Sequence, residues 1–165
     1  MATRDEPLPL GQKIDQMLTE ARVILPGAQA LLGFQLAVAL TQAFDSLPAS
    51  LKAAHACALS LIALSTILLM APAAYHRIVY AGEDSEDMVR TGSILVTAAT
   101  LPLAIGLAID IDVVIAKIAD SGIAGLVSGA AALVLLLSLW YGYPLAMAAR
   151  NQRRGVTAKP QGQSG

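Results

Sequence analysis

The sequence has few charged residues and almost no cysteine, and both shortages narrow the class of protein. Lysine, arginine, aspartate and glutamate make up 14% of the 165 residues, whereas an ordinary soluble domain has about 25%. The single cysteine, Cys57, excludes an intramolecular disulfide framework. A formal net charge of −1 excludes the basic surface of a nucleic-acid binder. The composition therefore argues against a water-soluble globule and against nucleic acid as a partner.

Motifs of enzymes, metal sites and nucleotide-binding proteins are also missing. The sequence contains no P-loop, no nucleophile elbow and no glycine-rich dinucleotide fingerprint. Its two histidines, His55 and His76, flank one apolar segment and would lie about 31 Å apart on a straight helix, too far to share a cofactor. We therefore expect neither an enzyme nor a protein with a metal or another cofactor.

Hydrophobic residues make up 56% of the chain and gather in four long segments. A membrane-spanning helix needs about 20 mostly apolar residues. These segments are apolar on all sides, whereas the helices of a soluble bundle are apolar on one face. The pattern predicts an all-α, four-helix transmembrane bundle in the lipid bilayer. The predicted transmembrane domain, residues 23–149, contains spans at about 23–44, 56–75, 91–110 and 123–149.

Polar segments stand at both ends of this predicted domain. In the N-terminal segment, residues 1–22, Leu10, Ile14 and Met17 recur at helical spacing opposite polar residues. This pattern predicts an amphipathic helix at the membrane interface, with Pro26 near the bend into the first span. A plain extension of the first span is the alternative. The C-terminal segment, residues 150–165, is polar and rich in glycine and proline, and we expect a disordered cytoplasmic tail.

Lysines and arginines lie mainly on one side of the predicted spans. With four spans, the two termini and the central loop share a side, and only Lys52 and Lys117 fall on the other. Because cytoplasmic loops retain Lys and Arg, both termini of this multi-pass membrane protein are expected in the cytoplasm. Trp140, Tyr141 and Tyr143 cluster toward the cytoplasmic end of the fourth span, as interface aromatics do.

Asp110 and Asp112 are the most informative carboxylates of the chain. A charge in the middle of the bilayer costs about 2.5–3.5 kcal/mol on insertion scales, so such residues are candidates for function. Counting about 20 residues from Arg90 places Asp110 at the outer end of the third span. The two side chains point about 200° apart around a helix and do not share one site. We expect solvated residues at a helix end, with an ion- or proton-handling role as the alternative.

Polar and small residues inside the spans indicate how the helices pack. The first predicted span contains three glutamines, Gln29, Gln35 and Gln42, of which the last two share a helix face. Hydrogen bonds to neighbouring helices are the usual role of such residues, and the polar lining of a permeation path is the alternative. Gly125 and Gly129 form a GxxxG motif, which allows a close approach to another span or to a second copy of the chain.

Two ordered motifs resemble those of a known family. Residues 20–29 read EARVILPGAQ and are followed by Phe34, and residues 71–77 read APAAYHR. Together they resemble a family of small bacterial four-span membrane proteins classed as a domain of unknown function, over about residues 10–145. The resemblance implies the four-span fold and a location in the bacterial inner membrane, but no established activity. Some members of that family carry an automated label as sodium–proton antiporters.

The resemblance also draws attention to polar groups at the cytoplasmic ends of the first two spans. Because antiparallel neighbours bring these ends together, we predict a polar cluster at the cytoplasmic face. An ordinary belt of snorkelling charges is the alternative. The residues of the predicted cluster are Glu20, Arg22, Gln29, His76 and Arg77.

The sequence favours a non-enzymatic structural or accessory subunit that acts through helix packing. Its partners would be the lipid bilayer and another membrane protein or a second copy of the chain. The alternative, from a different class, is an oligomeric transporter of protons or cations. An ionisable group embedded in the membrane distinguishes the two, because transport of protons or cations requires one.

Overall fold

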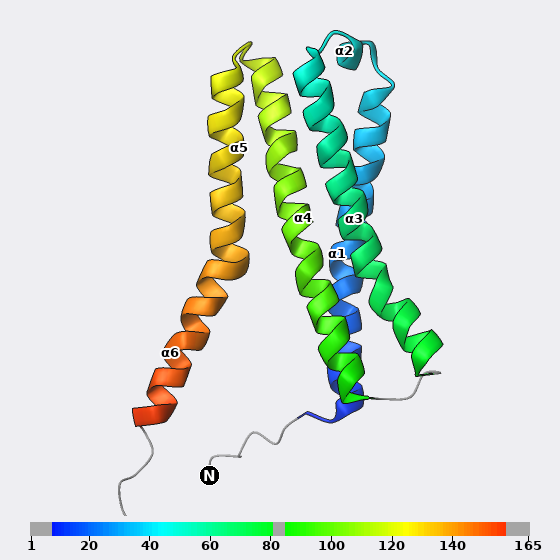
Figure 1. Ribbon diagram of the computed structural model, residues 1–165, viewed down its shortest axis with the longest axis vertical. Helices are drawn as coiled ribbons and strands as arrows, with labels where there is room; N and C mark the ends of the chain where they lie inside the picture. Colours follow the sequence, from blue (N-terminus) through cyan, green and yellow to red (C-terminus); the bar gives the residue numbers. More distant parts are fainter. Residues whose placement is uncertain (1–7, 81–84, 158–165) are drawn as a thin grey trace, which may run out of the picture.

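The computed structural model describes residues 8–80 and 85–157, and these ranges are helical without a strand. Four long helices run side by side along the molecule, and the short α2 connects the first two (Figure 1). The last long helix consists of α5, a π-helical segment η1 and α6. The elements are α1 (Leu10–Ala39), α2 (Gln42–Asp45), α3 (Ala49–Val79), α4 (Glu86–Ile118), α5 (Gly122–Leu137), η1 (Ser138–Gly142) and α6 (Tyr143–Thr157).

Each of the four long helices is long and apolar enough to cross a membrane, the last as Gly122–Arg153. At about 1.5 Å per residue, all four exceed the roughly 30 Å thickness of the hydrocarbon core. Large apolar side chains such as Phe34, Ile67 and Ile123 are exposed on their outer faces, as expected of helices that face lipid. The chain is therefore a multi-pass membrane protein, and the predicted all-α class with four spanning helices is confirmed.

The centre of the bundle is the contact between α3 and α4. Ile62 of α3 and Met88 of α4 are fully buried. Gly106 lets the two helices approach closely, because a Cβ atom there would lie 2.8 Å from Cγ1 of Ile62. The Ser65 hydroxyl donates a hydrogen bond across the same contact to the carbonyl oxygen of Ala99, at 2.8 Å. α4 also packs against α1 and α5, so it is the helix on which the others assemble.

The amphipathic N-terminal segment is helical and continues directly into the first span. α1 runs from Leu10 to Ala39 through Pro26, so the chain does not bend there into a separate helix. Met17 is buried in the core and fills the space beside Gly92 of α4, where a Cβ atom would collide with its sulfur. The apolar face of the segment is thus buried on α4, and this contact keeps it in line with the span.

Three helix ends at the α2 end of the bundle differ from the predicted spans, and the first is the start of α3, at Ala49 instead of residue 56. α1 ends at Ala39 instead of residue 44, because the Thr41 side chain caps α2 by accepting a hydrogen bond from the Phe44 amide at 3.3 Å. α4 continues to Ile118 instead of ending at residue 110. The contact of α4 with α5 over these extra residues favours the longer helix, and it leaves only residues 119–121 to connect the two.

The final helix also extends beyond its predicted end. α6 continues to Thr157, so residues 150–157 of the predicted disordered tail are helical. Arginine and glutamine, which are good helix formers, make up half of residues 150–157. The rest of the predicted tail, residues 158–165, lies outside the described residues, as do residues 1–7.

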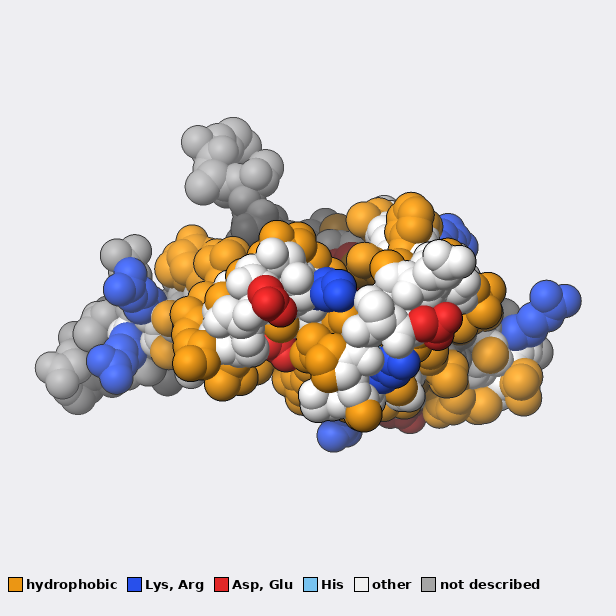
Figure 2. Space-filling view, turned by 90° about the horizontal axis from the view of Figure 1, so that it is seen from above, with side chains coloured by type: hydrophobic (Ala, Val, Ile, Leu, Met, Phe, Trp, Pro, Cys, Tyr) orange, Lys and Arg blue, Asp and Glu red, His pale blue; other side chains and the backbone are white. Residues whose placement is uncertain are grey.

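The described ends of the chain lie at the same end of the bundle. In Figure 1 the start of α1 and the end of α6 are at the bottom, whereas α2 and the α4–α5 connection are at the top. Figure 2 shows the bundle from the α2 end. Acidic and basic side chains lie beside exposed backbone atoms there, and hydrophobic side chains surround them. The end of the bundle that holds α2 is therefore polar, and large apolar side chains are exposed along the sides of the bundle.

Candidate functional site

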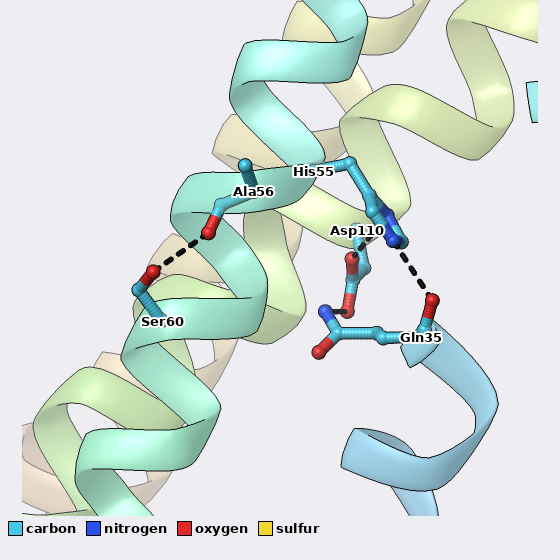
Figure 3. Close-up of polar contacts among 5 residues, drawn as sticks. All are labelled: Gln35, His55, Ala56, Ser60 and Asp110. Atoms are coloured by element: carbon cyan, nitrogen blue, oxygen red, sulfur yellow. Dashed lines mark hydrogen bonds and ion pairs between the residues drawn. The ribbon is translucent and has the colours of Figure 1, made fainter. Parts of the chain in front are cut away.

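Three polar side chains meet between α1, α3 and α4, toward the α2 end of the bundle (Figure 3). Gln35 lies in the last turns of α1, His55 in the second turn of α3, and Asp110 in the second half of α4. Gln35 and His55 are buried, with 5% and 6% of their surface exposed. The Asp110 side chain is 21% exposed. An ionisable pair is thus enclosed by three membrane-spanning helices.

The position of this site follows from the lengths of the helices. Asp110 lies eight residues before the end of α4, which is about 12 Å along the helix axis. His55 lies six residues after the start of α3, about 9 Å from that end. The predicted helix end at Asp110 is not found, because α4 continues for about two more turns. Asp110 therefore belongs to the inside of the bundle and not to a solvated loop.

Hydrogen bonds connect all three residues. Gln35 Nε2 donates to Asp110 Oδ2 at 2.6 Å. His55 Nε2 lies 3.1 Å from the backbone carbonyl oxygen of Gln35 and donates to it, because a carbonyl oxygen only accepts. The other ring nitrogen, His55 Nδ1, faces Asp110 Oδ1 at 3.8 Å, an ion-pair distance that is longer than a hydrogen bond.

These contacts determine how many protons the pair can hold. Since His55 Nε2 carries a hydrogen, Nδ1 of the neutral ring has only a lone pair, which would face the carboxylate oxygen. The contact is favourable when one proton is added, either on His55, giving imidazolium and carboxylate, or on Asp110, giving neutral imidazole and carboxylic acid. The geometry therefore suits a pair that shares one exchangeable proton.

The Gln35 amide fits both of these states. Its Oε1 atom is buried and has no hydrogen-bond partner among the described residues, which costs about 1–3 kcal/mol. A 180° turn of the amide exchanges Oε1 and Nε2. With Nε2 toward Asp110 the amide donates to the carboxylate, and with Oε1 toward Asp110 it accepts from the protonated acid. Gln35 can thus stabilise Asp110 with or without its proton.

An aromatic ring and a lysine lie between this site and the end of the bundle. The Phe44 ring of α2 contacts the His55 ring edge-on, with 5.2 Å between the ring centroids. Lys52 Nζ lies 5.9 Å from the centroid of the Phe44 ring and donates to the Asp45 carbonyl oxygen at 2.9 Å. Lys52 thus helps to hold α2 and its aromatic ring over His55.

Asp112 lies at a different contact, against α5. A Cβ atom at Gly125 would lie 2.6 Å from the Asp112 backbone oxygen, and one at Gly129 would lie 2.9 Å from the Asp112 Cβ. The two glycines therefore bring α5 directly onto α4 of the same chain. Asp110 and Asp112 occupy separate surroundings, in accordance with their spacing along the helix.

The polar cluster predicted at the cytoplasmic ends does not assemble through direct polar contacts. Among the described residues no hydrogen bond or ion pair joins its members, which are Glu20, Arg22, Gln29, His76 and Arg77. Glu20 faces a groove beside Trp140. The Nε2 atom of His76 is buried without a hydrogen-bond partner in the described part of the chain.

The sequence analysis missed the contact of Gln35 and His55 with Asp110. The available signal was depth, because all three residues lie within a few turns of the same end of the bundle once α4 extends to Ile118. Each is also a polar residue in an apolar segment, where an interhelical hydrogen bond is expected. Considered together, the depth and the polarity of these residues would have predicted that all three lie at the same height in the bundle.

Comparison with curated proteins and with solved structures gives no significant match. The sequence does match DUF6328, described as a family of unknown function, over residues 9–144. The matched range includes α1 to α5, η1 and all three residues of the site. The chain therefore belongs to DUF6328, a family of unknown function.

Proposed function

We propose that this protein is a proton-coupled membrane transport protein in which Asp110 and His55 bind and release the proton. The carboxylate of Asp110 facing His55 between three membrane-spanning helices carries the proposal. Ionisable residues inside membrane proteins are costly to bury and typically form proton relays or ion pathways. The sequence favoured a structural subunit because it placed no such group inside a span. The position of Asp110 supports the transport alternative.

A proton suits this site better than a metal cation does. Hard cations are held by several oxygen ligands, but Asp110 meets an imidazole nitrogen and an amide N–H. The imidazole of histidine changes its charge between about pH 5 and 8. Two lysine side chains near this end of the bundle bind other groups. Lys52 donates to the Asp45 carbonyl oxygen, and Lys117 donates to the Ser46 hydroxyl oxygen at 3.2 Å. Beside the carboxylate the site offers one unpartnered oxygen among the described residues, Gln35 Oε1, which is fewer oxygens than a hard cation takes.

Proton release would change the packing around the site. Without the shared proton, His55 Nδ1 and Asp110 Oδ1 face each other as two acceptors, and the contact becomes unfavourable. Since His55 is on α3 and Asp110 on α4, relief of this repulsion separates the two helices at this level. Proton binding is thereby coupled to the position of α3 and of the α2 segment that covers His55.

The test compares two aspartate variants of the same helix in proteoliposomes that enclose a pH-sensitive dye. We expect an imposed pH gradient to drive proton flux through the wild type. Asp110→Asn, which keeps the shape but cannot ionise, should reduce this flux more than tenfold. Asp112→Asn is the matched control and should leave the flux unchanged. Infrared difference spectra between acidic and alkaline pH should show a carboxyl band that Asp110→Asn removes.

Two results would exclude the proposal. One is equal proton flux in the wild type and Asp110→Asn. The other is a wild-type protein with neither proton flux nor a titrating carboxyl band, because the site would then bind no exchangeable proton.

A second proposal keeps the function that the sequence favoured, a non-enzymatic structural or accessory membrane subunit. It rests on α5, which packs mainly on α4 and leaves the sides that carry Ile123, Leu126 and Val134 open to lipid or to another helix. A partner membrane protein or a second copy would cover this side. Mass measurement of the intact assembly in mild detergent should then show an added chain, and a monomer would contradict this proposal.

A further inference from the structure

A groove opens between α1, α4 and η1, in the half of the bundle away from Asp110. Its volume is ≈ 470 Å³, within the range of about 300–1,000 Å³ typical of sites for small molecules. α1 contributes Glu20 and Ile24, and η1 contributes Trp140 and Tyr141. The wall on α4 consists of two apolar side chains, Val96 and Leu103, and two threonines, Thr97 and Thr100. The groove thus combines one carboxylate with an apolar and aromatic lining.

The π-helical segment η1 presents the aromatic side of this groove. π-Helical turns are rare and often occur at functional sites. The Tyr141 hydroxyl donates to the Thr97 carbonyl oxygen at 3.0 Å and lies 2.6 Å from Thr100 Oγ1. These contacts tie η1 to α4 and hold the neighbouring Trp140 beside the groove. The aromatic groups are therefore positioned by specific hydrogen bonds.

The charge of the groove points to the chemistry of its ligand. No hydrogen bond or ion pair joins Glu20 to another residue that the structure describes. A carboxylate beside apolar surface attracts a cation more strongly than it does in bulk water. A tryptophan face adds a cation–π attraction of about 0.5–2 kcal/mol. An anion would meet repulsion from Glu20, and a neutral hydrocarbon would gain from neither group.

We propose that this groove binds a lipophilic organic cation, with its charged centre between Glu20 and Trp140 and its apolar body along α4. Burial of apolar surface against α4 supplies affinity, and Glu20 selects the sign of the charge. This site is separate from the Asp110–His55 pair, and the proposal does not depend on proton transport.

The single tryptophan of the chain gives a direct readout of binding. Trp140 is the only tryptophan, so intrinsic fluorescence reports on this groove. The protein in phosphatidylcholine nanodiscs is titrated with tetraphenylphosphonium, and we expect a saturable change in emission. Glu20→Gln should weaken the affinity at least tenfold. Glu86→Gln, an exposed glutamate at the start of α4 outside the groove lining, should bind like the wild type.

A second pair of measurements separates site binding from uptake into lipid. Tetraphenylborate, a probe of similar shape and opposite charge, should give no saturable change at an equal membrane-bound concentration. By equilibrium dialysis, Trp140→Leu should bind tetraphenylphosphonium at least tenfold more weakly. Because Glu20 is exposed, Glu20→Gln should keep the circular dichroism and melting temperature of the wild type.

Equal affinity of the wild type and Glu20→Gln would overturn the proposal. So would a non-saturable response of the wild type, which indicates partition into lipid only, or equal saturable binding of the cation and the anion. All of these readouts measure binding, so they hold whether or not the protein moves protons.

Discussion

Single polar side chains carry the chemistry of this otherwise apolar bundle. Asp110 without neighbours would be an expensive charge, but Gln35 donates to one of its oxygens and His55 faces the other. Removing one member of such a set leaves the others without partners, which costs more than the net contribution of the intact contact. This is why the variant proposed for Asp110 is the isosteric amide and not alanine.

Two serines of α3 allow the same substitution to be compared in different surroundings. Ser65 is fully buried and donates across to the Ala99 carbonyl oxygen on α4. Ser60 is exposed and donates to the Ala56 carbonyl oxygen of its own helix (Figure 3). We expect Ser65→Ala to destabilise the protein by about 0.6–2 kcal/mol, the range of interhelical hydrogen bonds. Ser60→Ala should change stability by less than about 0.5 kcal/mol.

Unfolding in mixed micelles with increasing denaturing detergent measures both free energies. Equal effects of the two serine variants would show that the bond from Ser65 to α4 adds nothing to the packing of the helix pair.

The long helices meet where a small residue lets another backbone approach. Gly125 is such a position, since a Cβ atom there would lie 2.6 Å from both the Ala116 Cβ and the Asp112 backbone oxygen. Backbone atoms cannot yield as the end of a flexible side chain can. The contact between α4 and α5 therefore depends on the absence of a side chain at this position.

The same glycine-to-alanine change at two positions tests the packing of α5. We expect Gly125→Ala to destabilise the protein by about 1–3 kcal/mol through overpacking. Gly27→Ala, in α1 with open space around it, should be neutral or stabilising by up to about 1 kcal/mol. Melting temperatures in detergent compare the two variants. A Gly125→Ala variant as stable as Gly27→Ala would show that α5 does not need this close approach.

For the molecule as a whole, the two ends of the bundle define its orientation in the membrane. The described ends of the chain lie together at one end, and the connection at 119–121 lies at the other (Figure 1). We propose the bacterial inner membrane as its location, with both termini in the cytoplasm. The excess of Lys and Arg on the side of the termini supports this orientation.

Reporter fusions check this topology. Green fluorescent protein fused to either terminus should fluoresce, and alkaline phosphatase fused there should be inactive. A phosphatase inserted at Asp120, in the opposite connection, should be active outside the cytoplasm. Termini that report different compartments would contradict an even number of membrane spans.

Hydropathy along the chain was sufficient to predict four membrane-spanning helices. A long apolar segment is stable in the bilayer when its backbone groups are hydrogen-bonded within the segment, as they are in a helix. The separation of Asp110 from Asp112 also followed from the geometry of one helix. Tertiary packing decided what local sequence does not encode. The contact between Asp110 and Gln35 joins residues 75 positions apart, and it forms because close contacts such as Gly92 on Met17 set the rotation and height of α1 against α4.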